Sequence, residues 1–497
     1  MLVGVKVTTA LVIVSKIRAT WAATLVGESE RRALDAGFEG LTSARQGGVD
    51  APTAPTPEEV EFESYQRRYS RNYEHGSTEY WLRRGLFEKR SAEVRAHNAR
   101  SDRLWDAVAG RFADFTEEER ASLRGYKHKA SPRSAGAELP PRVAAERELL
   151  RPILGNATLP LEFNWLNLTV AKHVPDQLQC GSCWALAAKS VLDAHHEIYV
   201  GTVRNFSAQQ IVSCAPDPRH CGGKGKCEGS TVELAFDWVL HNGCATQEDV
   251  PYLGKDLSET IAKCNASTQL SRGPHDLVGG GLSAKHGSTT LAGAYFQMYG
   301  YKMLERNNEG ALIRSLYQHG PVATSACADT WFEYERGIIN SCNESCIVDH
   351  AITLYGYGQE VIGASPDEGH HGDNFQVLDA DSSTQGRQQG KVVMYWLIRN
   401  SWGPDWGEKG FLRLARFGRE GAHCGTDTDN SEGTGCDGDP KVVEVCGMCG
   451  FLWDSVIPHF HKSEADNSDE SLLTDVSAQG NAKLLRRELL GAPVSSA

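Results

Sequence analysis

The sequence has no long hydrophobic run, no excess of positive charge and no internal repeat. No stretch approaches the roughly 18 consecutive apolar residues that a membrane-spanning helix needs, so we expect no membrane span. The formal net charge of −13 gives no electrostatic basis for binding nucleic acid or an anionic membrane surface. No self-similarity occurs at the periods of solenoid proteins. The 497 residues are enough for a large core and for more than one domain.

Cysteine is present in an intermediate amount. Fourteen cysteines are too few for a small disulfide scaffold and many for a reduced cytosolic enzyme. Five N-x-S/T sequons lie in the region that also holds most of the cysteines, at Asn156, Asn167, Asn205, Asn265 and Asn343. The apolar run TTALVIV near the N-terminus, followed by small residues, is typical of a short signal peptide. These features predict a disulfide-bonded protein of the secretory route, in a lumen or outside the cell.

Composition changes divide the chain into segments. The first segments are a signal peptide and a polar linker that ends in APTAPTP. A charged, proline-free stretch with helical periodicity follows, then a proline-containing exposed connector and a long region rich in cysteine, glycine and tryptophan. A polar, acidic tail that we expect to be disordered comes last. The predicted boundaries, in order, are 1–25, 26–57, 58–128, 129–158, 159–458 and 459–497.

The long region predicts an α+β fold. A helix is expected to begin at Cys183 and to run through ALAAKSVLDAHHEIYV. Later segments have the pattern of strands, at 350–356, 394–399 and 410–414. A helical first half followed by a sheet-rich second half belongs to the α+β class.

The stretch CGSCW allows four interpretations of Cys180 and Cys183. A redox pair needs a βαβ context, and the preceding residues do not form a convincing strand. A zinc site needs a second ligand pair at matched spacing, and the distant Cys446 and Cys449 have no suitable histidine, so we expect no metal. A bridge between Cys180 and Cys183 would close a strained loop. The fourth interpretation makes Cys180 structural and Cys183 a nucleophile.

The chemistry of a helix start favours the fourth interpretation. The free N–H groups and the dipole at a helix N-terminus stabilise a thiolate at Cys183. A nucleophilic thiolate also needs a histidine and a third group that orients it. His350 enters a strand and Asn400 ends another, and a hairpin of the two would join their side chains, with Trp402 covering that hydrogen bond. The Gln177 amide and the Cys183 N–H would form an oxyanion hole.

This ordered set resembles the papain-like cysteine proteases, the cathepsin group. The family motifs match at Gln177, Cys183, His350 and Asn400, and the run N-S-W-G-P-x-W-G-x-x-G-F that begins at Asn400 is very specific. The resemblance covers about 159–458. It implies a two-lobed fold with a helical lobe and a β-barrel-like lobe. It also implies endopeptidase activity on protein or peptide substrates without a cofactor, and a lysosomal, vacuolar or extracellular place of action.

The proline-free stretch resembles the family's inhibitory propeptide. Six positions spaced by three or four share one helix face: Glu79, Arg83, Phe87, Arg90, Val94 and Asn98. Phe112-x-Asp114 is similar to the second propeptide motif, whose usual glycine and asparagine are replaced by Val108 and Gly110. The resemblance implies that 58–128 is a helical inhibitory domain that occupies the chain's own cleft and is removed by cleavage within about 126–158. The two replacements leave its inhibitory strength open.

The resemblance also suggests a substrate-binding segment and disulfide partners. Gly229, Ser230 and Trp402 match the substrate-binding positions, although the family has a second glycine where Ser230 stands. The implied bridges are Cys180–Cys227, Cys214–Cys264 and Cys342–Cys424. Additional expectations are a bridge between Cys221 and Cys244, a local bridge between Cys446 and Cys449, and a free thiol at Cys327.

Two spacings depart from the family. Cys183 and His350 are 167 residues apart, above the roughly 130–150 that is usual, and the surplus is expected in the glycine-rich stretch 270–300. His350 and Asn400 are 50 residues apart, and the surplus 359–391 is expected to form an exposed loop distal to the cleft. An alternative is that His370-His371 in this loop cap the cleft and make an exopeptidase.

Two other functions remain open at this stage. The same scaffold could serve a peptide-transferring ligase or an exopeptidase. It could also be an inactive binding protein that kept the fold, although intact Cys183, His350 and Asn400 argue against this.

Overall fold

The computed structural model describes residues 56–125, 159–257, 264, 292–343, 345–362, 390–418 and 423–462. Of these, residues 56–88 with 116–118 form one compact unit, and the others form a second. The predicted signal peptide and connector lie outside the described residues, as do nearly all of the linker, the 359–391 insertion and the acidic tail. Among the described residues, no helix combines the length and apolarity that a membrane crossing requires.

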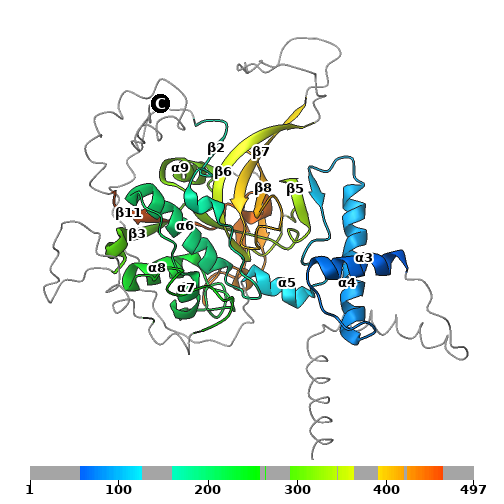
Figure 1. Ribbon diagram of the computed structural model, residues 1–497. Coiled ribbons are helices and arrows are strands. Elements are labelled where there is room, and N and C mark those ends of the chain that lie inside the picture. The colour runs from blue at the N-terminus through cyan, green and yellow to red at the C-terminus, as the bar shows by residue number, and fades with distance from the viewer. Residues whose placement is uncertain are drawn as a thin grey trace, which may run out of the picture. The chain divides into compact units, whose positions relative to one another are not determined.

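The first unit contains two helices, α3 (Pro57–Arg68) and the beginning of α4 (Thr78–Asn98) (Figure 1). The Thr56 hydroxyl caps α3 by accepting a hydrogen bond from Glu59 N at 3.2 Å, with Pro57 in the first turn. The helices pack through aromatic rings, with the Phe87 centroid 5.5 Å from Phe62 and 4.6 Å from Tyr65. The helix predicted over 79–98 is therefore present, with Phe87 on its buried side.

In the second unit, the end of α4 holds the chain that follows it. The Asn98 side chain exchanges two hydrogen bonds with the Ala107 backbone, at 2.8 and 2.9 Å. The buried Arg90 guanidinium donates to the carbonyls of Phe112 and Ala113, at 3.3 and 3.0 Å. These contacts fix the course of strand β1 (Trp105–Ala107) and of the turn before helix α5 (Glu117–Arg124).

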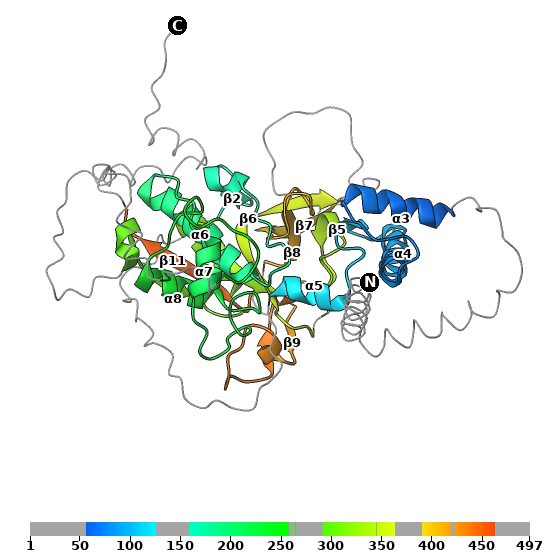
Figure 2. The same cartoon turned by 60° about the horizontal axis from the view of Figure 1, so that its bottom comes forward.

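The helical part of the second unit surrounds α6 (Cys183–Val200), which begins and ends where the sequence predicts. It packs with α7 (Ala208–Cys214) and α8 (Val232–Asn242) around a core that includes Trp184, Phe206 and Phe236. Gly201 ends α6 in the left-handed conformation, with φ of +80°. Helix α9 (Glu309–His319) lies against strands farther along the chain. In both views, α6, α7 and α8 gather on one side of strands β6, β7 and β8 (Figure 1, Figure 2).

Most of the described strands form one nine-stranded sheet, in the order β1-β5-β8-β7-β6-β4-β11-β3, with β2 paired to β6. Its remaining strands are β2 (Phe163–Asn164), β3 (Met298–Met303), β4 (Val322–Ala326), β5 (Tyr334–Ile339), β6 (His350–Ile362), β7 (Lys391–Arg399), β8 (Phe411–Arg416) and β11 (Ser455–Phe460). A separate pair joins β9 (Gly425–Asp427) to β10 (Val443–Val445). The α+β class is confirmed. Among the described strands the sheet is open and does not close into a barrel.

The β6–β7 hairpin sets the place of two predicted site residues. The strands are antiparallel, with Thr353 opposite Arg399 and Ile362 opposite Lys391. His350 at the start of β6 and Asn400 just after β7 therefore lie at the same end. The other end of β6 lies about 40 Å from His350, because twelve further strand residues each add about 3.3 Å. The insertion leaves β6 at that distant end, while His370-His371 lie outside the described residues.

Six disulfides join twelve of the fourteen cysteines. The bridges Cys180–Cys227 and Cys214–Cys264 have the partners that the sequence analysis expected. The prediction of a Cys342–Cys424 bridge is wrong, and so is the prediction of a local bridge between Cys446 and Cys449. The structure instead has the pairs Cys342–Cys449 and Cys424–Cys446. The Cys446–Cys449 turn directs its two sulfurs to different segments, with Cys449 in the left-handed region at φ of 58°.

Two further cysteine expectations are corrected. Cys221 bonds to Cys436 and not to Cys244, because the backbone hydrogen bond from Gly222 N to Gly435 O, at 3.0 Å, already holds the two loops together. Cys327 is bonded to Cys346 and is not a free thiol. The two free thiols are Cys183 and Cys244, and both are buried. Sequence separation carries no information on which distant cysteines meet.

Candidate active site

Cys183 is the first residue of α6 and its side chain is fully buried. Its Sγ donates a hydrogen bond to the backbone carbonyl of Arg124, at 3.2 Å. The Ala351 backbone N–H approaches Sγ to 3.5 Å from strand β6. The sulfur thus lies between the start of a helix, the start of a strand and a segment from the N-terminal part of the chain.

His350 and Asn400 meet at the end of the β6–β7 hairpin, and both are buried. The distance between His350 Nε2 and Asn400 Oδ1 is 2.7 Å. Asn400 Oδ1 also accepts from Ser401 N at 2.8 Å, so this amide atom is the oxygen and Nε2 carries the proton. The other nitrogen, Nδ1, makes no hydrogen bond of normal geometry among the described residues, although the Arg124 backbone lies near enough to favour the charged imidazole. The Trp402 ring, centred 5.0 Å from the imidazole, shields the hydrogen bond from water.

The Gln177 side chain is completely buried beside Cys183. Its Nε2 donates to Leu123 O at 2.7 Å and to Cys180 O at 2.9 Å. Its Oε1 accepts from the Ser401 hydroxyl at 2.7 Å, which fixes the orientation of the amide. An amide N–H that could stabilise an oxyanion is therefore occupied by a carbonyl of the chain itself.

The segment from Ser122 to Gly125 passes directly over these residues. A Cβ placed on Gly125 would overlap Cys183 Sγ, and one placed on Gly229 would overlap the carbonyl oxygen of Gly125. Gly229 has φ of +95°, a conformation that glycine adopts without strain. The Gly229 position predicted to bind substrate is thus in contact with this segment. Ser230 next to it is fully buried.

Burial governs the charge of the two reactive groups. It raises the pKa of the Cys183 thiol to about 12, although the Ala351 N–H acts in the opposite direction. It lowers the pKa of His350 to about 4 against the effect of the Asn400 hydrogen bond. Near neutral pH the covered site therefore holds a thiol and a neutral imidazole rather than an ion pair.

Arginine side chains fasten the covering segment beside the site. Arg124 Nε lies 2.5 Å from the Asp349 carboxylate, next to His350. Burial raises the pKa of Asp349 to about 6, which the charge of Arg124 partly counteracts. Arg120 forms an ion pair with Glu333 in the same way. These pairs hold α5 and the residues after it over Cys183.

A second anchor lies before α5. Arg111 Nη1 is 2.6 Å from Asp176 Oδ2 and 3.0 Å from the Trp402 carbonyl. The Phe112 ring packs edge-on against Phe332 and Trp402, with both centroids at 5.5 Å. The same Trp402 that shields the His350–Asn400 hydrogen bond is therefore covered by the N-terminal part of the chain.

The residues 159–434 match the model of the papain family of cysteine proteases. The chain belongs to this family. It is accordingly a cysteine peptidase, and its substrates are peptides.

Related proteins agree with this membership. Fruit bromelain of Ananas comosus is 24% identical over 356 residues, which is 71% of this chain and 80% of that protein. A digestive procathepsin L 3 of Tenebrio molitor superposes with a TM-score of 0.52 at 19% identity, over 82% of this chain and 100% of the other. The Amb a 11 cysteine protease of ragweed pollen, in its proform, gives 0.53 at 20% identity, over 82% and 95%. This papain-family chain thus has the fold of a proform.

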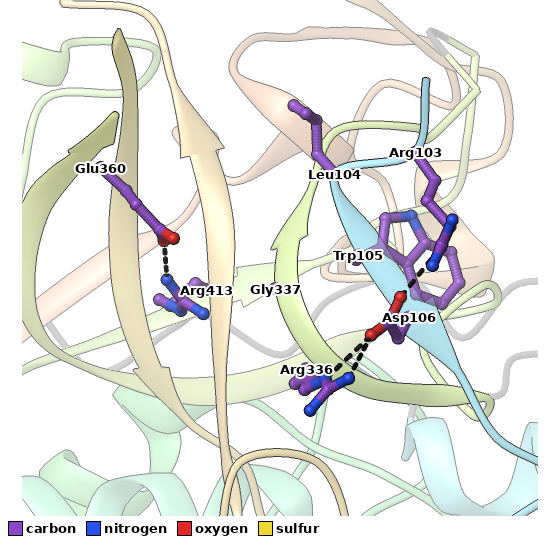
Figure 3. Close-up of a pocket in the computed structure, with 8 residues that line it drawn as sticks. All are labelled: Arg103, Leu104, Trp105, Asp106, Arg336, Gly337, Glu360 and Arg413. Carbon is purple, nitrogen blue, oxygen red and sulfur yellow. Dashed lines mark hydrogen bonds and ion pairs between the residues drawn. The ribbon is translucent and has the colours of Figure 1, made fainter. Parts of the chain in front are cut away.

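A surface pocket of about 360 Å³ lies apart from the candidate active site, where β1 pairs with β5 (Figure 3). Asp106 points between Arg103 and Arg336, at 2.9 and 2.8 Å, and Arg413 contacts Glu360. Each of these charged side chains has an ion-pair partner, and the pocket contains none of the residues around Cys183. The described residues also contain no group of histidine, cysteine or carboxylate side chains arranged to hold a metal ion.

The residues that cover the site were not predicted from the sequence. The carbonyls of Leu123 and Arg124 are backbone groups, and no side-chain motif announces them. Gly125 directly after the end of α5 was the available signal, since a glycine there permits a positive φ and a close approach. Asp349, directly before His350, was not predicted to have a role.

Proposed function

We propose that this chain is the zymogen of a cysteine endopeptidase with Cys183, His350 and Asn400 as its catalytic triad. The observation that carries the proposal is the cover over the site. The Arg124 carbonyl accepts a hydrogen bond from the Cys183 thiol, while the Leu123 carbonyl accepts one from the Gln177 amide. Two consecutive backbone carbonyls, one held against the thiol and the other against the amide donor, resemble peptide backbone bound as a substrate would be.

Removal of the cover would expose the sulfur to His350 Nδ1, which is the nitrogen not bonded to Asn400. The thiol proton passes to Nδ1, and the thiolate attacks the carbonyl carbon of the scissile bond. The resulting oxyanion accepts hydrogen bonds from Gln177 Nε2 and from the Cys183 N–H. The imidazolium then protonates the leaving amine, and an acyl-thioester remains on Cys183.

Hydrolysis of the thioester completes the cycle. Neutral His350 takes a proton from water, which attacks the thioester carbonyl, and the proton returns to the Cys183 sulfur as the acid product leaves. Asn400 keeps the imidazole in the required tautomer and orientation throughout. Gly229 and Ser230 would pair with the substrate backbone, with Trp402 beside them.

The domain organisation belongs to the same proposal. Residues 1–25 act as a signal peptide, 26–57 as a linker and 58–128 as the inhibitory propeptide. Cleavage within about 126–158 releases the peptidase domain 159–458 from this propeptide, while 459–497 forms an acidic tail. The six disulfides and the predicted signal peptide support the secretory route, with action in a lysosome, a vacuole or outside the cell.

The test compares full-length wild type with full-length Cys183→Ala, each before and after limited treatment with pepsin at acid pH. If the chain is an endopeptidase, processed wild type should cleave an internally quenched peptide that is blocked at both ends. A thiol-directed epoxide would label processed wild type at Cys183 and would not label Cys183→Ala. Cleavage only of peptides with a free end would indicate an exopeptidase. Absence of any cleavage by unlabelled processed wild type, when a separate aliquot of the same sample is labelled by the epoxide at Cys183, would indicate a ligase or a binding protein.

A further inference from the structure

The Tyr252 hydroxyl joins two points of the loop that leads into α6. It lies 2.8 Å from the carbonyl oxygen of Gln177 and 2.5 Å from the Ser182 hydroxyl. A carbonyl oxygen only accepts, so Tyr252 donates its proton to Gln177. Ser182 then donates to Tyr252, and its contact with Cys180 O, at 3.5 Å, is the longer of the two. One phenol thus ties the backbone of Gln177 to Ser182, the residue directly before Cys183, and so contacts the chain at both groups of the proposed oxyanion hole.

Ser182 occupies the position where a serine usually caps a helix. An N-cap serine accepts a hydrogen bond from a backbone N–H of the first turn. Ser207 does this for α7, accepting from Gln210 N at 3.0 Å. Ser182 makes no such side-chain bond to α6. The same chain therefore uses one serine as a cap and turns the hydroxyl of the other toward Tyr252.

The loop on the other side of Tyr252 has a strained backbone. Leu178 adopts φ of 55°, which is uncommon for a residue with a branched side chain. Its N–H donates to Asp176 Oδ1 at 2.9 Å, and the carbonyl before it is the one that Tyr252 holds. The peptide between Gln177 and Leu178 is thus fixed at both ends. A strained conformation persists only where its surroundings hold it.

We propose that Tyr252 is a positioning residue of the oxyanion hole. Its hydroxyl fixes the Gln177 peptide and keeps the Ser182 hydroxyl away from the helix start, so that the N–H groups there remain available to the sulfur and to the oxyanion. This inference rests on the proposed function. Burial raises the pKa of Tyr252, so the phenol stays protonated and continues to donate at any working pH.

The experiment uses full-length Tyr252→Phe, Ser182→Ala and the double variant, each processed with pepsin and normalised by active-site titration with the epoxide. Losing an oxyanion donor itself costs roughly 10²- to 10³-fold in kcat, and a positioning residue should cost less. We expect kcat of Tyr252→Phe to fall about tenfold with KM within about twofold. The control is Tyr357→Phe, which removes a buried hydroxyl with no hydrogen-bond partner among the described residues.

The double variant tests the route through Ser182. In Tyr252→Phe the serine hydroxyl is free to accept from the first turn of α6, and in the double variant it is absent. The loss in kcat caused by Tyr252→Phe should therefore be about threefold in the Ser182→Ala background. The rate of Cys183 alkylation by iodoacetamide decreases at acid pH, where the thiolate becomes protonated. The pH of this decrease should be higher in Tyr252→Phe than in wild type and should return toward the wild-type value in the double variant.

Three outcomes overturn the inference while wild type remains active. In the first, Tyr252→Phe leaves kcat and the alkylation of Cys183 unchanged. In the second, Tyr252→Phe lowers kcat by the same factor in the wild-type and in the Ser182→Ala background. In the third, Tyr252→Phe lowers the Tm but leaves kcat per titrated site unchanged. If Tyr252→Phe yields no folded protein, Ser182→Ala decides, because the inference requires it to retain kcat within about threefold of wild type. Inactive wild type would instead overturn the proposed function, and with it this inference.

Discussion

The Cys183 sulfur donates its hydrogen bond to the Arg124 carbonyl, 59 residues earlier in the same chain. The contact places peptide backbone where a substrate carbonyl would approach a nucleophile. It also removes the sulfur from water, which accounts for the raised pKa of the thiol. A single contact thus links the segment over the site to the raised pKa of the thiol beneath it.

Alkylation of Cys183 should depend on processing and on pH. In the covered chain the thiol pKa is about 12 and that of His350 about 4, so the thiolate forms only as the pH rises toward 12. Iodoacetamide should therefore react slowly at pH 6 and faster at alkaline pH. After processing, the reaction at pH 6 should accelerate by at least about a hundredfold, because an ion pair with His350 holds the thiolate.

The measurement is made in a Cys244→Ser background, because Cys244 is the other free thiol and burial raises its pKa to about 12 as well. Mass spectrometry identifies the labelled residue, and Cys183→Ala gives the background. Equal rates at pH 6 before and after processing would contradict the proposed role of the covering segment.

Gly125→Ala should weaken the cover. The added methyl group would overlap Cys183 Sγ, so the segment must move away from the site. Full-length Gly125→Ala should therefore process itself several-fold faster than wild type at acid pH, as followed by gel electrophoresis. Gly76→Ala is the matched control, because Gly76 has the same φ of +79° but no atom within 4 Å of the added methyl. The same acceleration in both variants would mean that backbone strain, and not contact with Cys183, causes it.

Asn400→Ala should lower kcat more than it raises KM. The variant loses the hydrogen bond that fixes the His350 tautomer, and we expect a decrease in kcat of about a hundredfold. Steady-state kinetics on the processed enzyme measure this. Asn242→Ala removes a comparable bond, from Asn242 Nδ2 to Trp238 O at 3.0 Å on α8, and should keep kcat near wild type. Retained kcat in Asn400→Ala would remove Asn400 from the proposed triad.

Buried His195 should make the fold less stable in acid. Burial lowers the pKa of His195 from 6.5 to about 3. The Nδ1 atom of its ring has no hydrogen-bond partner among the described residues. The unfolded chain binds more protons between these values, so the contribution to stability is full above pH 6.5 and declines as the pH falls toward 3. At pH 5 the loss is about 2 kcal/mol.

Full-length His195→Gln should therefore show a smaller decrease in the free energy of unfolding between pH 7 and pH 5 than wild type, measured by denaturant titration. The glutamine amide can keep the hydrogen bond to Pro321 O, which is 2.8 Å long in the wild type. His241→Gln, on the exposed side of α8, is the control and should leave the pH dependence unchanged. An identical decrease in wild type and in His195→Gln would refute this assignment.

Local pattern was sufficient for the elements that carry the site. The helix from Cys183 to Val200 has the predicted bounds, because its apolar residues and the glycine after it are local signals. Strands β6, β7 and β8 lie where the alternating segments were read, within a few residues except at the distant end of β6. The hairpin that joins His350 to Asn400 followed from the same pattern, and the distance of 2.7 Å fits it.

The long-range pairings were decided by the tertiary structure. Cys342 and Cys424 were expected to pair, but each found another partner, because two loops far apart in the sequence approach the same turn at Cys446 and Cys449. Likewise, the carbonyls of Leu123 and Arg124 reach the site only because ion pairs and the β1–β5 pairing hold that stretch of backbone in place. Backbone groups are alike at every residue, so the sequence could name the nucleophile but not the peptide that covers it.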